Sequence, residues 1–328
     1  MRGAIRGQFT RALLKSSIAC LLLSSLGLVI SGQQDASDSS SRADRSVSEP
    51  ADRTKSTIRV HSDLVLIPVT VTDGSGKVVS GLTKEQFTLF EDKTPQEITH
   101  FAAEDAPASI GIVFDASDSM APKLRKAREA VDALLRSAYS DDEFLLIRFS
   151  TEARVVVPLT TRLEEVRSEM GRLRVGGSTA LLDGVRLALG EMAHARSSRK
   201  AIVVISDGED NSSHSSVAEL KTAVRNQDIV IYTIGIMDPV GPNIGAPLLK
   251  TIATQTGGHL FEVNKLNQLP DIAAKIGGWL RSQYVLGYVP NRQERDGAYR
   301  KVDLKVDRPK GYPRLHTVWR QGYYAPKE

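Results

Sequence analysis

The chain has 328 residues, of which 41% are hydrophobic and 25% are charged. This balance is normal for a globular protein, excludes a wholly disordered chain and, at this length, favours two domains. The formal net charge of +4 equals the charge of the four basic residues in positions 1–32, so the remainder is neutral and predicts no nucleic-acid partner.

The first 32 residues have the three parts of a secretory signal peptide. Four basic residues and no acid precede an apolar stretch at 18–30, and small and polar residues follow it. The stretch is short for a membrane span, which needs roughly 20 residues. We therefore expect a signal peptide at 1–32 and a secreted or periplasmic protein. The alternative is a retained anchor, which would be the chain's only link to a membrane.

The only cysteine, Cys20, lies inside this apolar stretch, whereas a lipoprotein cysteine would follow it. A chain cleaved after the signal peptide would hold no cysteine, which excludes disulfides, thiol catalysis and cysteine-ligated zinc. Residues 33–56 are rich in Ser, Asp and Arg and have almost no apolar residue. Such a segment cannot repay the entropy lost on ordering, so we predict a disordered linker.

Short strand patterns occupy residues 57–107. Ile58 and Val60 alternate with polar residues, and 64–72 is a long stretch rich in β-branched residues, followed by a turn at 73–76. Strand patterns return after residue 283, at 284–289, 299–306 and 315–319. Because the first segment alone is near the lower size limit for an independent core, we predict that both segments build one small β-sandwich.

Strands and helices alternate between these two segments. Apolar strands are predicted at 110–114, 144–149, 154–157, 202–205, 229–234 and 259–261, and the apolar residues between them recur at helical spacing from Leu124, Leu181 and Leu269. This alternation indicates a parallel sheet covered by helices on both faces.

Oxygen-bearing side chains cluster where two of these strands end. Asp115, Ser117 and Ser119 follow the first strand, with Pro122 predicted in the first turn of the next helix, and Asp207 follows the fourth strand. Thr179 opens another helix after two glycines. Ligands bind at the carboxyl edge of such sheets, so the two acids would converge there if their strands are neighbours. Oxygen donors without sulfur or imidazole select Mg²⁺, Mn²⁺ or Ca²⁺.

The same residues carry a resemblance to a known family. D-A-S-D-S at 115–119, G-G-S-T ending at Thr179 and S-D-G around Asp207 together resemble the metal-ion-dependent adhesion site of von Willebrand factor A domains. The resemblance covers residues 108–282. The flanking sequences VTVTDGSGKVVSGLTKEQFTLFEDKTPQEITHF and QYVLGY are similar to those of A-domain-related secreted proteins of Acidobacteria.

The resemblance implies an α/β, Rossmann-like doubly wound von Willebrand factor A domain, inserted in or flanked by the β-sandwich. It also implies that Ser117 and Ser119 bind the metal directly, whereas Thr179, Asp115 and Asp207 bind it directly or through water. The predicted divisions are 1–32 signal peptide, 33–56 linker, 57–107 N-terminal sandwich strands, 108–282 A domain and 283–328 C-terminal strands.

The expected function is therefore non-enzymatic. The bound divalent cation would capture an Asp or Glu carboxylate of a protein partner. Two alternatives stay open: a structural cell-envelope protein with a vestigial site, and a metal-assisted hydrolase, although the chain has neither H-E-x-x-H nor G-x-S-x-G. In a further interpretation, Asp115 and Ser117 merely cap the following helix and bind nothing.

Overall fold

The computed structural model describes residues 64–103, 106–224, 227–237 and 243–327. The predicted signal peptide at 1–32 and linker at 33–56 lie outside the described residues. Within the described ranges, none of the helices combines the length and the apolar character that crossing a bilayer requires.

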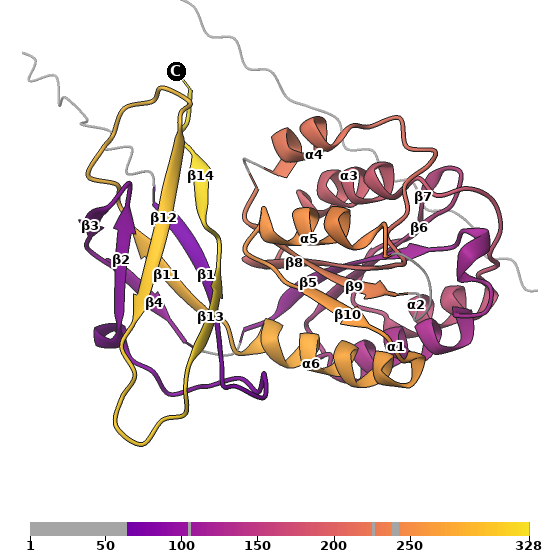
Figure 1. The fold of residues 1–328 in the computed structure, drawn as a ribbon, viewed down its shortest axis with the longest axis horizontal. Coiled ribbons are helices and arrows are strands. Elements are labelled where there is room, and N and C mark those ends of the chain that lie inside the picture. Colours follow the sequence, from indigo (N-terminus) through magenta and orange to yellow (C-terminus); the bar gives the residue numbers. More distant parts are fainter. Residues whose placement is uncertain (1–63, 104–105, 225–226, 238–242, 328) are drawn as a thin grey trace, which may run out of the picture. The chain divides into compact units, whose positions relative to one another are not determined.

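A six-stranded sheet forms the centre of the α/β part, with the strand order β10-β9-β8-β5-β6-β7 (Figure 1). Its strands are β5 Ala108–Asp115, β6 Glu143–Phe149, β7 Ala153–Thr160, β8 Arg199–Ser206, β9 Ile229–Ile236 and β10 Leu260–Val263. Five strands run parallel, but the edge strand β7 is antiparallel to β6. The prediction of a parallel sheet was wrong for this strand, because only residues 150–152 separate β7 from β6 and a parallel crossover needs a dozen or more.

Six helices cover the two faces of this sheet in the described residues. They are α1 Leu124–Arg136, α2 Leu163–Arg172, α3 Leu181–Met192, α4 Val217–Val224, α5 Ala246–Thr254 and α6 Leu269–Arg281. One core contains apolar residues of α1, α2 and α6, and a second contains those of α3, α4 and α5. Successive side chains of β5 pack into opposite cores: Ile112 belongs to the first core and Val113 to the second. The predicted doubly wound fold is thereby confirmed.

The turn between β5 and α1 differs from the prediction in one detail. A short 3₁₀ helix spans Asp118–Met120, and α1 begins at Leu124 with Lys123 as its N-cap residue. Pro122 therefore precedes the helix and does not lie in its first turn. The reason is local: the turn that carries Ser119 closes on itself through a hydrogen bond from Ala121 N to Asp118 O.

The remaining strands form two antiparallel four-stranded sheets with the orders β13-β1-β11-β4 and β14-β12-β2-β3. Their bounds are β1 Val65–Thr72, β2 Phe87–Glu91, β3 Thr94–Gln96, β4 His100–Ala102, β11 Tyr284–Tyr288, β12 Tyr299–Val306, β13 His316–Trp319 and β14 Gly322–Tyr324, and a 3₁₀ helix at Lys84–Gln86 precedes β2. Strands before and after the α/β part pair directly, as β1 with β11 and β2 with β12. The two sheets share one core that contains Ile67 and Leu89, so the flanking β-sandwich of the predicted fold is present.

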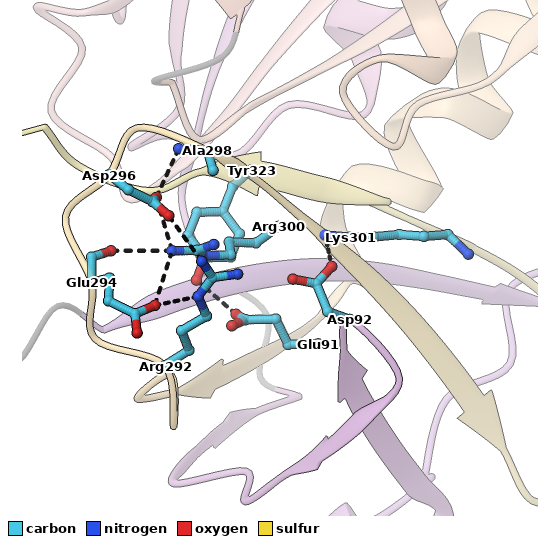
Figure 2. Close-up of polar contacts among 9 residues, drawn as sticks. All are labelled: Glu91, Asp92, Arg292, Glu294, Asp296, Ala298, Arg300, Lys301 and Tyr323. Atoms are coloured by element: carbon cyan, nitrogen blue, oxygen red, sulfur yellow. Dashed lines mark hydrogen bonds and ion pairs between the residues drawn. The ribbon is translucent and has the colours of Figure 1, made fainter.

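A buried carboxylate links the two sheets of the sandwich. Glu91 on β2 is 3% exposed, and it accepts hydrogen bonds at 2.7 Å from Tyr288 of the opposite sheet and from Tyr323 on β14. Burial, together with Glu91, raises the pKa of both tyrosines, so their hydroxyls remain protonated donors. Beside this pair, Figure 2 shows the buried Arg300 in its ion pair with Asp296, at 2.9 Å.

Candidate metal centre

Asp115 lies at the carboxyl edge of the sheet, at the end of β5, and is fully buried. Its Oδ1 accepts hydrogen bonds from the backbone N of Ser117 at 2.9 Å and from the Ser117 hydroxyl at 2.6 Å. Its Oδ2 accepts one from the hydroxyl of Ser206, at the end of the adjacent strand β8, at 2.6 Å. The carboxylate is thus held in one orientation by two neighbouring strands.

The surroundings of Asp115 favour a nearby positive charge. Burial raises its pKa to about 6, because the hydrogen bonds from Ser117 and Ser206 only partly offset the loss of water and the charge of Asp207 adds to the increase. A cation bound beside Asp115 would therefore stabilise the ionised carboxylate. Asp207 is close enough to act on this pKa, which places the second predicted acid at the same edge of the sheet.

The two serines of the first loop lie side by side. The hydroxyl oxygens of Ser117 and Ser119 are 3.1 Å apart, with Ser117 buried and Ser119 exposed. Asp115, Ser117 and Ser119 consequently present three oxygens from one five-residue turn, with the outermost facing solvent. This gradient of exposure suits a metal site that is anchored in the protein and open at one side.

The loop that carries Thr179 is joined to this turn by backbone hydrogen bonds. Gly176 N donates to Ala116 O at 2.7 Å, and Asp118 N donates to Gly177 O at 3.0 Å. Gly177 has a φ of +91°, and a Cβ there would lie 2.6 Å from the hydroxyl of Thr151, so both the backbone conformation and the space require glycine. The close approach of the two loops therefore depends on this glycine.

Thr179 itself is 3% exposed and is held by the loop after β8. Its backbone N donates to Asn211 Oδ1 at 2.8 Å, and its carbonyl accepts from the backbone N of both Asn211 and Ser212 at 3.0 Å. The loop of Thr179 thus bonds both to the turn of Asp115 and to the loop of Asp207. The structure brings the three predicted segments together through these backbone contacts.

Asp207 follows β8, and its two carboxylate oxygens differ in their contacts. Oδ2 lies 2.8 Å from the ammonium nitrogen of Lys123, and the side chain of Asp207 is 11% exposed. Oδ1 is buried and has no hydrogen-bond partner among the described residues. A buried carboxylate oxygen without a partner is costly, and a metal ion or a metal-bound water would satisfy it.

The predicted donor set of this centre fits a hard divalent cation. Its five residues carry two carboxylates and three hydroxyls, which is the chemistry that Mg²⁺, Mn²⁺ and Ca²⁺ prefer. In the part of the chain that the structure describes, no group of three or more His, Cys, Asp or Glu side chains could hold a metal.

Several residues that support the centre have no role assigned to them from sequence. Ser206 orients Asp115, Asn211 holds Thr179, and Lys123 pairs with Asp207. Ser206 directly precedes Asp207, so the register of β5 against β8 would have identified it. Lys123 follows Ser119 by four residues, but only the turn geometry brings it back to the site.

Asp183 on α3 stabilises the loop that carries Asn211. Its carboxylate accepts hydrogen bonds from the backbone N of His214 and of Ser215, both at 2.9 Å. Burial acts to raise its pKa, but hydrogen bonds from Ser215 and His214 outweigh it and lower the pKa to about 2. Asp183 therefore anchors the loop after β8 at His214 and Ser215.

Comparison with known proteins agrees with this geometry. The family model described as von Willebrand factor type A domain matches residues 109–275. An uncharacterized protein of Borreliella burgdorferi is 26% identical over 219 residues, which cover 62% of each chain. Calcium-activated chloride channel regulator 1 of Bos taurus is 24% identical over 206 residues, 57% of this chain and 21% of that protein. The chain thus spans less than two thirds of the length of these curated relatives.

A solved structure, von Willebrand factor type A from Catenulispora acidiphila, has a TM-score of 0.47 and 14% identity, covering 81% of this chain and 74% of that one. Domains of the matching family bind divalent metal ions at this type of site and mediate protein–protein interactions. The family match covers half of the chain and coincides with the doubly wound sheet. The chain therefore belongs to the von Willebrand factor type A domain family.

Proposed function

We propose that the protein is a binding module that holds one divalent cation at Asp115, Ser117, Ser119, Thr179 and Asp207, and captures an Asp or Glu carboxylate of a protein partner through it. Mg²⁺ is the preferred ion, with Mn²⁺ or Ca²⁺ as substitutes. The observation that supports this most strongly is the buried Oδ1 of Asp207, at the edge of the sheet where Asp115 ends, which has no hydrogen-bond partner among the described residues.

Each residue has a distinct role in this proposal. Ser117 and Ser119 would bind the ion directly, because their hydroxyls lie together at 3.1 Å and one faces solvent. Thr179, Asp115 and Asp207 would bind it directly or through water. The ion would supply a concentrated positive charge and an open coordination position, which a partner's carboxylate could fill.

Binding is favoured over catalysis by the arrangement around Asp115. Both of its oxygens already accept hydrogen bonds from serine hydroxyls, so it is poorly placed to take a proton from a substrate. Two-metal hydrolysis would need further carboxylates or histidines, and the described residues contain no such cluster. We therefore favour a binding module over a metal-assisted hydrolase as the function of this protein.

The proposal also includes the predicted compartment and divisions of the chain. A signal peptide at 1–32 would direct the protein to the periplasm or outside the cell, and a retained one would anchor it to the membrane. The linker at 33–56 would separate this end from the sandwich strands at 57–107 and 283–328, with the A domain at 108–282 between them.

The first experiment measures metal binding by isothermal titration calorimetry. Wild-type protein should bind Mg²⁺, and Ser117→Ala should weaken binding by at least about 10-fold because a direct ligand is lost. Ser178→Ala is the matched control, since Ser178 is exposed and neighbours Thr179 without belonging to the proposed ligand set. Absence of Mg²⁺ and Mn²⁺ binding by the wild type would refute the proposal.

The second experiment tests the partner. Immobilised protein is incubated with cell-envelope extract in Mg²⁺ and then in EDTA, with Ser117→Ala in parallel. Retention that needs both Mg²⁺ and Ser117 supports capture through the ion. A partner that is retained equally in EDTA and by Ser117→Ala would instead support the structural alternative with a vestigial site.

A further inference from the structure

The ammonium group of Lys123 lies within the proposed metal centre. Its Nζ is 2.8 Å from Asp207 Oδ2, and the two side chains are only 19% and 11% exposed. The pair joins the start of α1 to the loop after β8, across 84 positions of the sequence. An ion pair this shielded from solvent is screened far less than a surface pair.

Two features of the backbone fix the position from which Lys123 reaches Asp207. Lys123 is the N-cap residue of α1, and its backbone N donates to Met120 O at 2.9 Å. Its carbonyl accepts the hydrogen bond from Ala127 N at 3.0 Å. Lys123 therefore begins from a rigid turn, the same turn that presents Ser119.

Two carboxylates meet at this edge of the sheet. Asp115 is fully buried and accepts a hydrogen bond at 2.6 Å from Ser206, the residue directly before Asp207. Lys123 supplies one positive charge to this pair and engages only one oxygen of Asp207. The other oxygen, Oδ1, is buried and has no partner in the part of the chain that the structure describes, so a metal could reach Asp207 while Lys123 keeps its contact.

We propose that Lys123 is a built-in counter-ion of the metal centre: it stabilises the Asp207 carboxylate in protein without metal, and it lowers the affinity of the centre for a divalent cation. The inference rests on the proposed function, because it assigns a role toward the ion held there. A unit charge about 5 Å from a divalent ion corresponds to roughly a 10-fold change in affinity in bulk water, which is a lower bound for this shielded pair.

The same charge has a consequence for the partner. The two ligand carboxylates and one divalent ion sum to zero, so with Lys123 these groups carry one net positive charge, beside the exposed Asp118 of the same turn. A positive centre attracts an acidic group and speeds its association. In this proposal the charge of Lys123 therefore has two opposite effects: it lowers the affinity for the metal, and it increases the attraction of the partner's carboxylate.

The test compares three variants with the wild type. Lys123→Met removes the charge but keeps most of the side chain, Lys123→Arg keeps the charge, and Lys126→Met is the matched control. Lys126 lies on the same helix, pairs with Glu129 and is 27% exposed. Lys123→Gln replaces Lys123→Met if the latter does not fold, because it retains a hydrogen-bond donor near Asp207 without the charge.

Two readouts are needed, the Mg²⁺ dissociation constant by calorimetry and the urea midpoint of unfolding in EDTA. We expect Lys123→Met to bind Mg²⁺ at least about 10-fold more tightly, because the repelling charge is gone. It should also unfold at lower urea in EDTA, because Asp207 loses its partner. Lys123→Arg and Lys126→Met should match the wild type in both measurements.

The outcomes separate this inference from the proposed function. If the wild type binds Mg²⁺ and Lys123→Met binds it no more tightly, or unfolds at the same urea concentration, the counter-ion role is wrong and the proposed function stands. If only Lys123→Met binds Mg²⁺ at millimolar concentration, the counter-ion role holds and the proposed function of the wild type fails. If neither binds, both fail.

Discussion

The hydroxyl of Ser206 donates a hydrogen bond to Asp115 Oδ2 at 2.6 Å, across 91 positions of the sequence. The same hydroxyl accepts a hydrogen bond from Gly208 N at 2.9 Å, so Ser206 links the first acid to the loop that carries Asp207. It is fully buried at the end of β8. The two acids of the centre therefore depend on one serine that binds no metal in our proposal.

Removing this hydroxyl should affect both folding and metal binding. We expect Ser206→Ala to lower the free energy of unfolding by about 1–3 kcal/mol, since buried Asp115 loses a donor. Metal affinity should fall about 10-fold, as for other residues that orient ligands. Urea unfolding and calorimetry measure the two effects. Ser212→Ala is the control, because the Ser212 hydroxyl is buried without a hydrogen-bond partner in the described residues; equal losses in both variants would contradict the role of Ser206.

Asp183 should make the free energy of unfolding depend on pH at low pH. Its pKa is lowered from 3.8 to about 2 in the folded protein, so between these values the folded state binds fewer protons than the unfolded state. Its contribution is therefore complete above about pH 4 and is lost as the pH falls through about 2. The difference in unfolding free energy between wild type and Asp183→Asn should shrink by roughly 1–2 kcal/mol over this range. A difference that is constant from pH 5 to pH 2 would contradict the account.

Gly208 is predicted to be intolerant of any side chain. Its φ is +85°, and a Cβ there would lie 2.6 Å from the carbonyl oxygen of Gly245. Gly208→Ala should cost roughly 2–4 kcal/mol, from backbone strain and from displacement of the neighbouring loop, and should weaken metal binding by moving Asp207. Gly190→Ala is the control: a Cβ at this position of α3 meets nothing within 4 Å, and we expect a gain of up to about 1 kcal/mol in thermal or urea unfolding.

In the sandwich, the hydroxyl of Tyr323 should contribute through Glu91. Tyr323→Phe removes one of the two tyrosine donors to this buried carboxylate and should destabilise the protein by about 1–3 kcal/mol. Tyr324→Phe tests the neighbouring tyrosine, whose ring lies edge-on to that of Tyr299 at 5.0 Å. We expect metal affinity to stay unchanged in both variants, and a loss of metal binding in Tyr323→Phe would contradict this separation of roles.

The fold was largely predictable because its signals are local. The buried strand β5 is apolar or small at nearly every position, and the face of α1 repeats at helical spacing, so type and order of these elements could be inferred. The apolar pattern of β7 does not report its direction, because an edge strand has the same pattern in either direction. The length of its connection to β6 does, since residues 150–152 are too few for a parallel crossover.

The candidate site was predictable only in part. Asp115, Ser117 and Ser119 lie within five residues, so their proximity follows from the chain itself. The convergence of Thr179 and Asp207 required strand order and two loop contacts, which the family resemblance supplied and local pattern did not. The roles of Ser206 and Lys123 depend on side-chain positions across the edge of the sheet. These positions cannot be inferred from the spacing of residues in the sequence.

The most direct test of the central claim is the position of a bound ion. Crystals grown with Mn²⁺ would be measured for anomalous scattering. We expect one Mn²⁺ peak in contact with the hydroxyl oxygens of Ser117 and Ser119, bounded by Thr179, Asp115 and Asp207, and a weaker peak or none there in Ser117→Ala. A peak elsewhere in the protein, or none at millimolar Mn²⁺, would contradict it.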